Sequence, residues 1–380
     1  MLRKSIVFTP DFPFLGQPKA AITERWLAHW QRLRALKQVS DSEAAAPAGE
    51  DDAGVEAFDD AERRMAEARH RIQWRAERLV KARERAAGIG ALKREILDPL
   101  REALKQGIAL AGPASEHEAD ELAAALFAEL PWMGAAIEPL WRDMRISARQ
   151  GRGLHFRPIL LDGPPGIGKS HLAQRLAALA ALPWTSIDLG STTEGFPIAG
   201  AERTWGSAMP GRPVRTILTH RIANPIVFVD ELDKAGVAYS SSGASTSAHN
   251  ALLSLVEPGT AQRWPCPYFG LRFDMRHVNW ILAANAIAPL PAPLRSRLRI
   301  VSVRGPNRAE MITFAARSLR QRGLPEDALV VLERLILTFP EGDPRLDLRR
   351  VLRMIEDIDQ RSQDVSFRIG RTQLVNAGVG

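Results

Sequence analysis

Apolar residues recur at helical spacing near the start of the chain. Ile22, Trp26, Trp30 and Leu33 follow one another at intervals of three or four residues within KAAITERWLAHWQRLRALKQV (residues 19–39), and Leu36 or Lys37 continues the series. This spacing predicts an amphipathic helix, which we assign to an N-terminal helical segment over residues 1–40. The following residues, 41–57, are mainly small and acidic and indicate a solvated linker.

From about Phe58 to Lys105 the pattern is helical, long and highly charged, with a break near the Gly-Ile-Gly of residues 88–90. Few apolar residues anchor it: Met65, Ile72, Leu79, Val80, Leu92 and Ile96. A helix of this kind buries little apolar surface by itself. We therefore expect residues 58–110 to form a coiled-coil-like arm, or a hairpin, that meets a partner helix or another subunit.

Globular character begins near Glu116, where two helical stretches, 121–130 and 136–151, precede a series of apolar strands. The strands are RPILLDG (157–163), WTSIDLG (184–190), PIVFVDEL (225–232) and VNWILAAN (278–285), and helical stretches separate them. This alternation predicts an α/β domain over residues 111–303, built on a parallel sheet between helices. After Val303 the pattern is helical only, which predicts a small helical domain over residues 304–380.

Charge is distributed unevenly, although its total is modest. The chain has 51 Lys and Arg against 44 Asp and Glu, a net charge of +7, which by itself indicates neither a nucleic acid nor an acidic substrate. Residues 61–105 hold 13 basic and 7 acidic side chains, whereas residues 41–60 hold eight acidic and no basic ones. The contrast marks a boundary between the linker and the arm.

Several classes of protein are not expected. The single cysteine, Cys266, excludes an internal disulfide framework and a multi-cysteine metal site, and fits a reducing cytosol. The N-terminus lacks the apolar core of a signal peptide, and no run of 18 apolar residues predicts a membrane span. We therefore expect a cytoplasmic protein that does not contact a membrane.

The loop between the first strand and the next helix has the pattern of a phosphate-binding loop: glycine, four residues, glycine, lysine, serine. Its residues are Gly163, Pro164, Pro165, Gly166, Ile167, Gly168, Lys169 and Ser170, followed by His171, which we expect to face solvent at the rim of the site. Glycines allow backbone N–H groups to surround a β-phosphate, the lysine reaches the β and γ oxygens, and the serine hydroxyl coordinates Mg²⁺. The sequence therefore predicts binding of ATP with Mg²⁺.

Two carboxylates end the strand of residues 226–231. Ile226 to Val229 are apolar, and Asp230 and Glu231 follow at the edge of the sheet where ligands bind in such folds. An acidic pair alone more often marks a solvated strand end. Together with the phosphate-binding loop, about 60 residues upstream, it predicts that Asp230 holds Mg²⁺ through water and that Glu231 polarises the attacking water.

These motifs, with ILAAN and PAPLRSRL further on, resemble those of the AAA+ ATPases, whose Walker A and Walker B motifs match the loop and the acidic strand end. Within that family the chain is most similar to the ATPase module of Lon proteases, through RTWGSAMPG, ANPIVFVDELDKAG and LLSLVEP. The resemblance covers roughly residues 130–355. It implies that residues 304–380 are the helical lid of the family. The Ser-Lys peptidase domain that follows in Lon has no room in the 25 residues after Ile355, so no peptidase activity is expected.

The resemblance also assigns roles to polar residues beyond these two motifs. Asn285 matches sensor 1, an amide that orients the lytic water. Arg297 matches the arginine finger offered to a neighbouring subunit, with Arg295 and Arg299 as competitors for that role. Arg345 matches sensor 2, with Arg349 as its competitor. The alternatives are a strand-capping amide for Asn285 and surface ion pairs for the arginines.

A tryptophan occupies the position at which Lon carries the aromatic residue of its central channel. Trp205 follows Arg203 and Thr204 and precedes the Met-Pro-Gly of residues 209–211, as in that family. Trp205 is therefore expected to grip a threaded polypeptide. Gly206 stands where Lon has a bulky apolar residue, which weakens the expected grip, and the alternative is a tryptophan packed under its own loop.

The implied function is Mg²⁺-dependent ATP hydrolysis by a homo-oligomeric, hexameric ring that remodels, unfolds or threads a protein substrate, alone or for a separate peptidase. The basic arm supports a different class, a nucleic-acid-associated motor, although interleaved Arg and Glu suit helix pairing equally well. A third class is a scaffold whose assembly is switched by nucleotide, against which Glu231 and Arg297 argue because a switch needs no hydrolytic groups. The identity of the substrate stays open.

Overall fold

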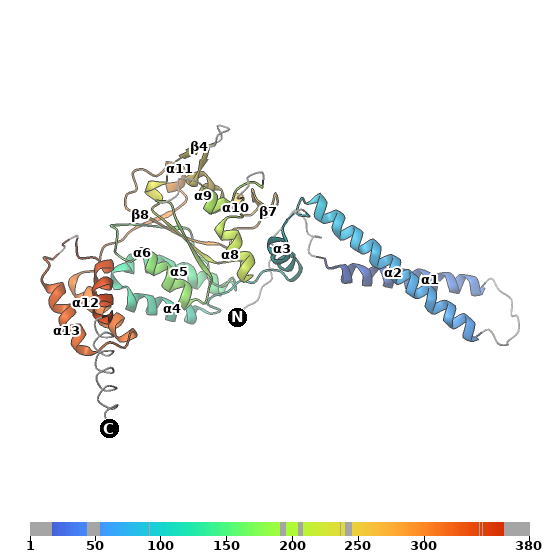
Figure 1. The fold of residues 1–380 in the computed structure, drawn as a ribbon, viewed down its shortest axis with the longest axis horizontal. Helices are drawn as coiled ribbons and strands as arrows, with labels where there is room; N and C mark the ends of the chain where they lie inside the picture. The colour runs from blue at the N-terminus through green and yellow to red at the C-terminus, as the bar shows by residue number, and fades with distance from the viewer. Residues whose placement is uncertain are drawn as a thin grey trace, which may run out of the picture.

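The computed structural model describes residues 17–43, 54–90, 92–190, 195–203, 208–235, 237–239, 245–341, 343 and 345–360. Its centre is a parallel sheet of five strands in the order β2-β3-β8-β1-β9 (Figure 1). The strands are β1 (Ile159–Asp162), β2 (Trp184–Asp188), β3 (Ile226–Asp230), β8 (Asn279–Ala284) and β9 (Arg299–Ser302). The predicted parallel sheet is confirmed.

Alternate residues of the strands enter two different cores. Leu160, with Val227 and Leu282 of the neighbouring strands, packs on one face of the sheet, whereas Ile159 and Phe228 pack on the other. Helices cover both faces, because a parallel sheet buries both of its faces. One layer contains α4 (Glu116–Glu129), α5 (Gly134–Arg149) and α6 (Lys169–Leu179); the other contains α3 (Arg94–Gln106), α8 (Arg212–His220) and α9 (Ala248–Val256).

The edge strand β9 was not predicted. It pairs with β1 from Ile159↔Arg299 to Asp162↔Ser302. It is short, begins and ends with polar residues, and leaves Ile300 exposed, because one of its sides has no neighbouring strand. A strand of this kind lacks the continuous apolar run by which the three central strands, β3, β8 and β1, are recognised.

Short elements complete this part of the chain. They are η1 (Pro131–Met133), α7 (Phe196–Ala199), η2 (Leu232–Lys234), α10 (Pro258–Ala261) and α11 (Ala292–Arg295), with the antiparallel pairs β4 (Val237–Tyr239) and β5 (Ser245–Ser247), and β6 (Trp264–Pro265) and β7 (Arg272–Phe273).

Three helices follow the sheet, as predicted for residues 304–380. They are α12 (Arg308–Gln321), α13 (Glu326–Leu337) and a helix over residues 348–360. A capping box begins α12: Asn307 accepts a hydrogen bond from the Glu310 amide, and the Glu310 carboxylate accepts one from the Asn307 amide. Phe314, Leu332 and Val351, one from each helix, pack in the same core as α4 and α6.

The N-terminal part forms a two-helix arm that projects from the α/β part (Figure 1). Its helices α1 (Lys19–Glu43) and α2 (Gly54–Ala86) pack together, with Ile22 and Ala76 fully buried and Lys19 paired with Glu77 at 2.8 Å. The helix predicted over 19–39 is therefore confirmed. The helix that α2 meets is α1 of its own chain, so the hairpin joins residues 19–43 to residues 54–86, a pairing that was not predicted.

The predicted break near residues 88–90 separates the arm from the sheet. Gly88 has φ +69°, a conformation that favours glycine. Ile89 is buried in the core on the face of the sheet that contains Leu160. Beyond the break, α3 places Leu97 and Leu100 in the same core. Residues 92–110, which the sequence assigned to the arm, therefore pack with the α/β part.

Candidate functional site

The loop of residues 163–168 connects β1 to α6 and depends on its glycines. Gly166 has φ +75° and Gly168 has φ +97°. A Cβ at Gly163 would lie 2.4 Å from the Val303 carbonyl oxygen, and one at Gly166 would lie 2.2 Å from a carboxylate oxygen of Asp347. The loop therefore combines left-handed backbone with close approach of other segments, and only glycine satisfies both conditions.

Lys169, the first residue of α6, points its ammonium group back across the loop. Nζ donates to the carbonyl oxygens of Gly163 at 2.6 Å and Ala284 at 2.9 Å, and to Oδ1 of Asn285 at 3.0 Å. Burial lowers the pKa of Lys169, and the carboxylates of Asp230, Asp233 and Asp162 act in the opposite direction. The structure thus brings Lys169 and Asn285 together at one edge of the sheet.

The acidic pair lies at the same edge, where β2 and β3 end side by side. Asp230 is opposite Asp188, and its Oδ1 accepts a hydrogen bond from the Glu231 amide at 2.9 Å. Burial raises the pKa of Asp230, although the nearby Lys169 lowers it. A partly buried carboxylate facing a buried ammonium is the electrostatic setting that a phosphate with its metal ion requires.

Glu231 has a left-handed backbone, with φ +53° and ψ +41°. This conformation is uncommon for a residue other than glycine and turns the chain sharply after β3. Its carboxylate lies so close to Gly190, after β2, that a Cβ there would be 1.6 Å from Oε2. Its other oxygen, Oε1, pairs with Lys234 Nζ at 2.7 Å.

A cavity of about 540 Å³ opens between the loop and the C-terminal helices. Residues of the loop line one side, and the other side is lined by the start of α12 together with Pro340, Glu341, Asp343, Leu346 and Asp347. The Leu348 amide donates to the Gly166 carbonyl at 3.2 Å, so the last helix contacts the loop directly. The volume is that of a small-molecule site, and the cavity adjoins the glycine loop that precedes Lys169.

Arg345 and Arg349 differ in their surroundings. Arg345 binds the Asp343 carboxylate, with Nη2 at 2.7 Å and Nε at 3.0 Å, and this contact lowers the pKa of Asp343 to about 2. Arg349 makes no ion pair with the residues that the structure describes, and its charge lowers the pKa of Lys169. Arg349 is therefore the arginine whose charge acts at the phosphate-binding loop.

Arg295, Arg297 and Arg299 lie at or just before the start of β9, so they are at the amino ends of the strands, whereas the glycine loop is at the carboxyl ends. Arg299 pairs with Asp143 of α5, with nitrogen–oxygen distances of 2.8 and 3.2 Å. Arg295 has a buried Nε without a hydrogen-bond partner among the described residues. Arg297 pairs with Glu257 at 2.7 Å. Arg297 and Arg299 line a second cavity of about 740 Å³, whose lining includes no residue of the glycine loop.

Trp205, Ser170 and His171 were also predicted to belong to the functional site. Trp205 lies outside the described residues. Ser170 is exposed in the first turn of α6, beside Lys169. His171, which was expected to face solvent, is half-buried: its ring packs edge-on against Phe314 at 6.2 Å between centroids, and burial lowers its pKa.

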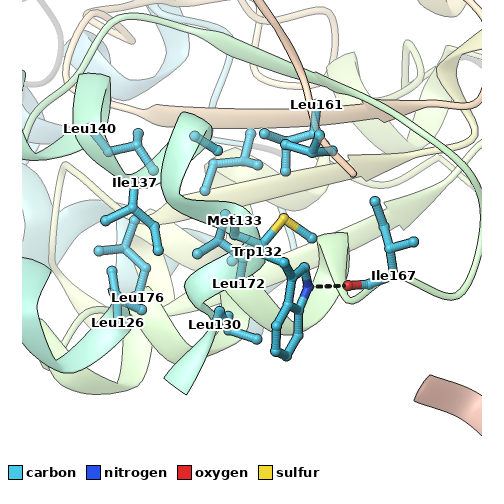
Figure 2. Packing of buried hydrophobic residues seen from close by; sticks show 14 of the residues in the cluster. Leu126, Leu130, Trp132, Met133, Ile137, Leu140, Leu161, Ile167, Leu172 and Leu176 are labelled. Carbon is cyan, nitrogen blue, oxygen red and sulfur yellow. Dashed lines mark hydrogen bonds between the residues drawn. The ribbon is translucent and has the colours of Figure 1, made fainter. Parts of the chain in front are cut away.

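Trp132 supports the loop and was not predicted. Its indole Nε1 donates to the Ile167 carbonyl at 2.9 Å, from a cluster of buried residues that includes Leu130, Met133 and Leu172 (Figure 2). The ring also packs edge-on against Phe314 of α12, with centroids 6.1 Å apart. In the sequence, the apolar Leu-Pro-Trp-Met run before α5 indicates that Trp132 is buried. It does not indicate the hydrogen-bond partner of Trp132, because Ile167 lies 35 residues later in the chain.

We predict that Trp132→Phe weakens nucleotide binding without unfolding the protein. The ring keeps its packing, but the Ile167 carbonyl loses its donor, at a cost of about 1 kcal/mol. The Kd for ATP, measured by calorimetry, should therefore rise about fivefold. The matched control is Trp141→Phe, because Trp141 donates to Asp120 without contacting the loop. Equal Kd values for the two variants would contradict the prediction.

Comparison with known proteins agrees with this geometry. Residues 159–305 match the family model of the ATPase family associated with various cellular activities (AAA). Similar proteins include Lon protease 2 of Myxococcus xanthus, 30% identical over 229 residues, which are 58% of this chain and 27% of that protein. Lon protease of Chloroherpeton thalassium is 33% identical over 173 residues, 45% of this chain and 20% of that protein. Lon protease homolog 2, peroxisomal, of Oryza sativa subsp. indica is 30% identical over 251 residues, 60% and 28% of the two chains.

The chain thus spans between a fifth and about 28% of the length of these relatives. Among the helices within the described ranges, none has the length and apolar character needed to cross a membrane.

Proposed function

Because the chain contains an AAA ATPase domain with distant Lon protease relatives, we propose that it is a Mg²⁺-dependent ATPase that forms a homo-oligomeric, hexameric ring and remodels or unfolds a protein substrate. The observation that carries the ATPase part is the meeting of Lys169, Asn285 and the Asp230–Glu231 pair around the glycine loop. AAA proteins are typically oligomeric, which supports a ring.

The loop of residues 163–170 would bind ATP. Its backbone N–H groups, including those at the N-terminus of α6, would donate hydrogen bonds to the phosphate oxygens, and the Lys169 ammonium would donate to phosphate oxygens in place of its carbonyl partners. Ser170 and Asp230 would hold Mg²⁺, which neutralises phosphate charge when bound. Trp132 keeps the loop in place by holding the Ile167 carbonyl.

Hydrolysis requires a base and an orienting group at the same edge. Glu231 supplies the carboxylate that takes a proton from water, and Asn285 orients that water with its amide. The Asn285 backbone amide is held by Asp233 at 3.2 Å, which fixes the start of its side chain. The pair formed by Glu231 and Lys234 is exposed, so it opens at little cost.

The surroundings of the arginines support one choice for each role. Both Arg299 and Arg297 form ion pairs, but the pair of Arg297 with Glu257 is more exposed than the pair of Arg299 with Asp143, which favours Arg297 as the finger that reaches the ATP of a neighbouring subunit. Arg345 is engaged with Asp343, whereas the charge of Arg349 acts on Lys169. We therefore assign the sensor-2 role to Arg349 in preference to Arg345, which the sequence favoured.

A protein substrate is favoured over a nucleic acid. The similarity to Lon includes the segment around Trp205, whose position in Lon is that of the channel aromatic. Arg203, which begins this segment, donates a hydrogen bond to the Gly88 carbonyl at the base of the arm. In the arm, Lys19 of α1 pairs with Glu77 of α2, which supports the use of its charges in helix pairing. A nucleic-acid motor is the second candidate, supported by the basic arm alone.

We predict that an unfolded model polypeptide stimulates Mg²⁺-ATP turnover and that Trp205→Ala loses most of this stimulation. The matched control is Trp74→Ala, because Trp74 is an exposed tryptophan of the arm and should leave the stimulation intact. Single- and double-stranded DNA are tested in parallel. Stimulation by DNA alone, steeply reduced by salt, would contradict a protein substrate and indicate the nucleic-acid motor.

A further inference from the structure

Arg297 is held by its own chain at two points. Its Nε pairs with Glu257 Oε2 at 2.7 Å, and its Nη1 donates to the Pro293 carbonyl at 2.8 Å. The remaining nitrogen, Nη2, donates no hydrogen bond to the described part of the chain. Arg297 and Glu257 both line the cavity of about 740 Å³ at this edge of the sheet. The guanidinium is therefore oriented beside a hollow that is large enough to receive a phosphate group.

The backbone of Glu257 is held in place because this residue lies between two helices. It follows the last residue of α9 and caps α10, where its carbonyl accepts hydrogen bonds from the Ala261 amide at 2.9 Å and from the Thr260 hydroxyl at 3.1 Å. Its backbone is thus fixed, while its side chain is 39% exposed. Glu257 can therefore hold Arg297 in one orientation without being part of the packed core.

The other end of α9 contacts the segment that follows the acidic pair. His249, in the first turn of α9, is buried, and its Nε2 lies 3.1 Å from the Leu232 carbonyl oxygen. Leu232 directly follows Glu231. With a rise of 1.5 Å per residue, the nine residues of α9 span roughly 13 Å between these two contacts. A single rigid helix thus connects the chain next to Glu231 to the residue that holds Arg297.

We propose that Glu257 is the positioning residue for Arg297 and that α9 links the nucleotide site of one subunit to the arginine that this subunit offers to the next. This inference rests on the proposed trans role of Arg297. A carboxylate on Nε turns the guanidinium so that its terminal nitrogens point away from the chain. A rotation of Glu231 and Leu232 on ATP hydrolysis would move α9 and change that orientation.

The test uses mixed rings, so that the arginine and the nucleotide site that it serves belong to different subunits. Arg297→Ala subunits keep their own nucleotide site but offer no finger. Lys169→Ala subunits offer an intact finger but bind ATP weakly, so they are assayed at an ATP concentration that leaves their own sites largely empty. We expect a mixture of the two to regain ATP turnover that neither has alone. In the decisive mixture, Lys169→Ala is replaced by the double variant Lys169→Ala/Glu257→Gln, and we expect the regained kcat to be lower by on the order of 10- to 100-fold.

The controls separate positioning from folding and assembly. The exposed Glu257–Arg297 pair contributes little to stability, so Glu257→Gln should leave the melting temperature and the sedimentation of the mixed ring unchanged. Lys169→Ala/Thr260→Ala alters the same turn without touching Arg297 and should support as much turnover as Lys169→Ala.

Turnover with Lys169→Ala/Glu257→Gln that equals or exceeds that with Lys169→Ala would overturn the positioning role while leaving the proposed function intact. Absence of turnover in both mixtures, with subunit mixing verified by sedimentation, would instead remove the trans role of Arg297 and the positioning role with it.

Discussion

Glu231→Gln should bind ATP as the parent protein does and hydrolyse it about 10²- to 10⁴-fold more slowly, the usual contribution of a general base. Glutamine has nearly the same shape as glutamate and keeps an oxygen for Lys234, so the sharp turn after β3 is preserved. It has no carboxylate to accept a proton from water. The measurement is single-turnover hydrolysis of radiolabelled ATP, with the Kd for ATP determined separately.

The control for Glu231→Gln is Glu138→Gln, which removes an exposed carboxylate that pairs with Arg142 on α5, away from the site. It should leave both hydrolysis and binding unchanged. Hydrolysis by Glu231→Gln at the parent rate would show that another group activates water. Loss of ATP binding would show that Glu231 contributes to holding the nucleotide.

Lys169→Ala should reduce ATP affinity by about 100-fold, equivalent to ~3 kcal/mol, which is the range for one buried charge-assisted hydrogen bond to phosphate. The fold should survive this change because the Ala284 carbonyl, one acceptor of Lys169, also accepts the Gly163 amide at 3.3 Å. Calorimetric titration with ATP and Mg²⁺ measures the affinity, and a melting curve verifies folding.

Lys81→Ala is the corresponding control, because Lys81 is an exposed lysine of the arm that pairs only with Glu77 among the described residues. It should leave ATP affinity unchanged. An unchanged Kd in Lys169→Ala would mean that ATP binds elsewhere, and the role assigned to the glycine loop would then be wrong.

The arm and the α/β part are joined more closely than the sequence indicates. Glu84, near the end of α2, forms a two-point ion pair with Arg101 of α3 at 2.8 and 2.9 Å. Ile89 and Leu97 are buried in the core of the sheet. We propose that the boundary of the arm lies at the turn after α2, near residue 88, and that the division predicted at residue 110 falls inside the packed part.

The sequence by itself determined the central strands of the sheet, the glycine loop of residues 163–168 and the acidic pair that follows β3. These are local patterns. Continuous apolar runs predict buried parallel strands, and glycine, lysine and serine in this order between a strand and a helix predict a phosphate-binding loop. The helical pattern of residues 19–39 was likewise sufficient for α1. Each of these predictions depends on residues that are close together in the chain.

Only the tertiary structure decided which distant residues meet. The hydrogen bond from Trp132 to Ile167, the contact of Lys169 with Asn285 and the pair of Arg297 with Glu257 join residues that are 35, 116 and 40 positions apart in the chain. The edge strand β9 and the place of α3 also depended on packing, because neither segment has a pattern that identifies its neighbour. Side-chain chemistry can be read from the sequence, but the partner of a side chain is set by how the whole chain packs.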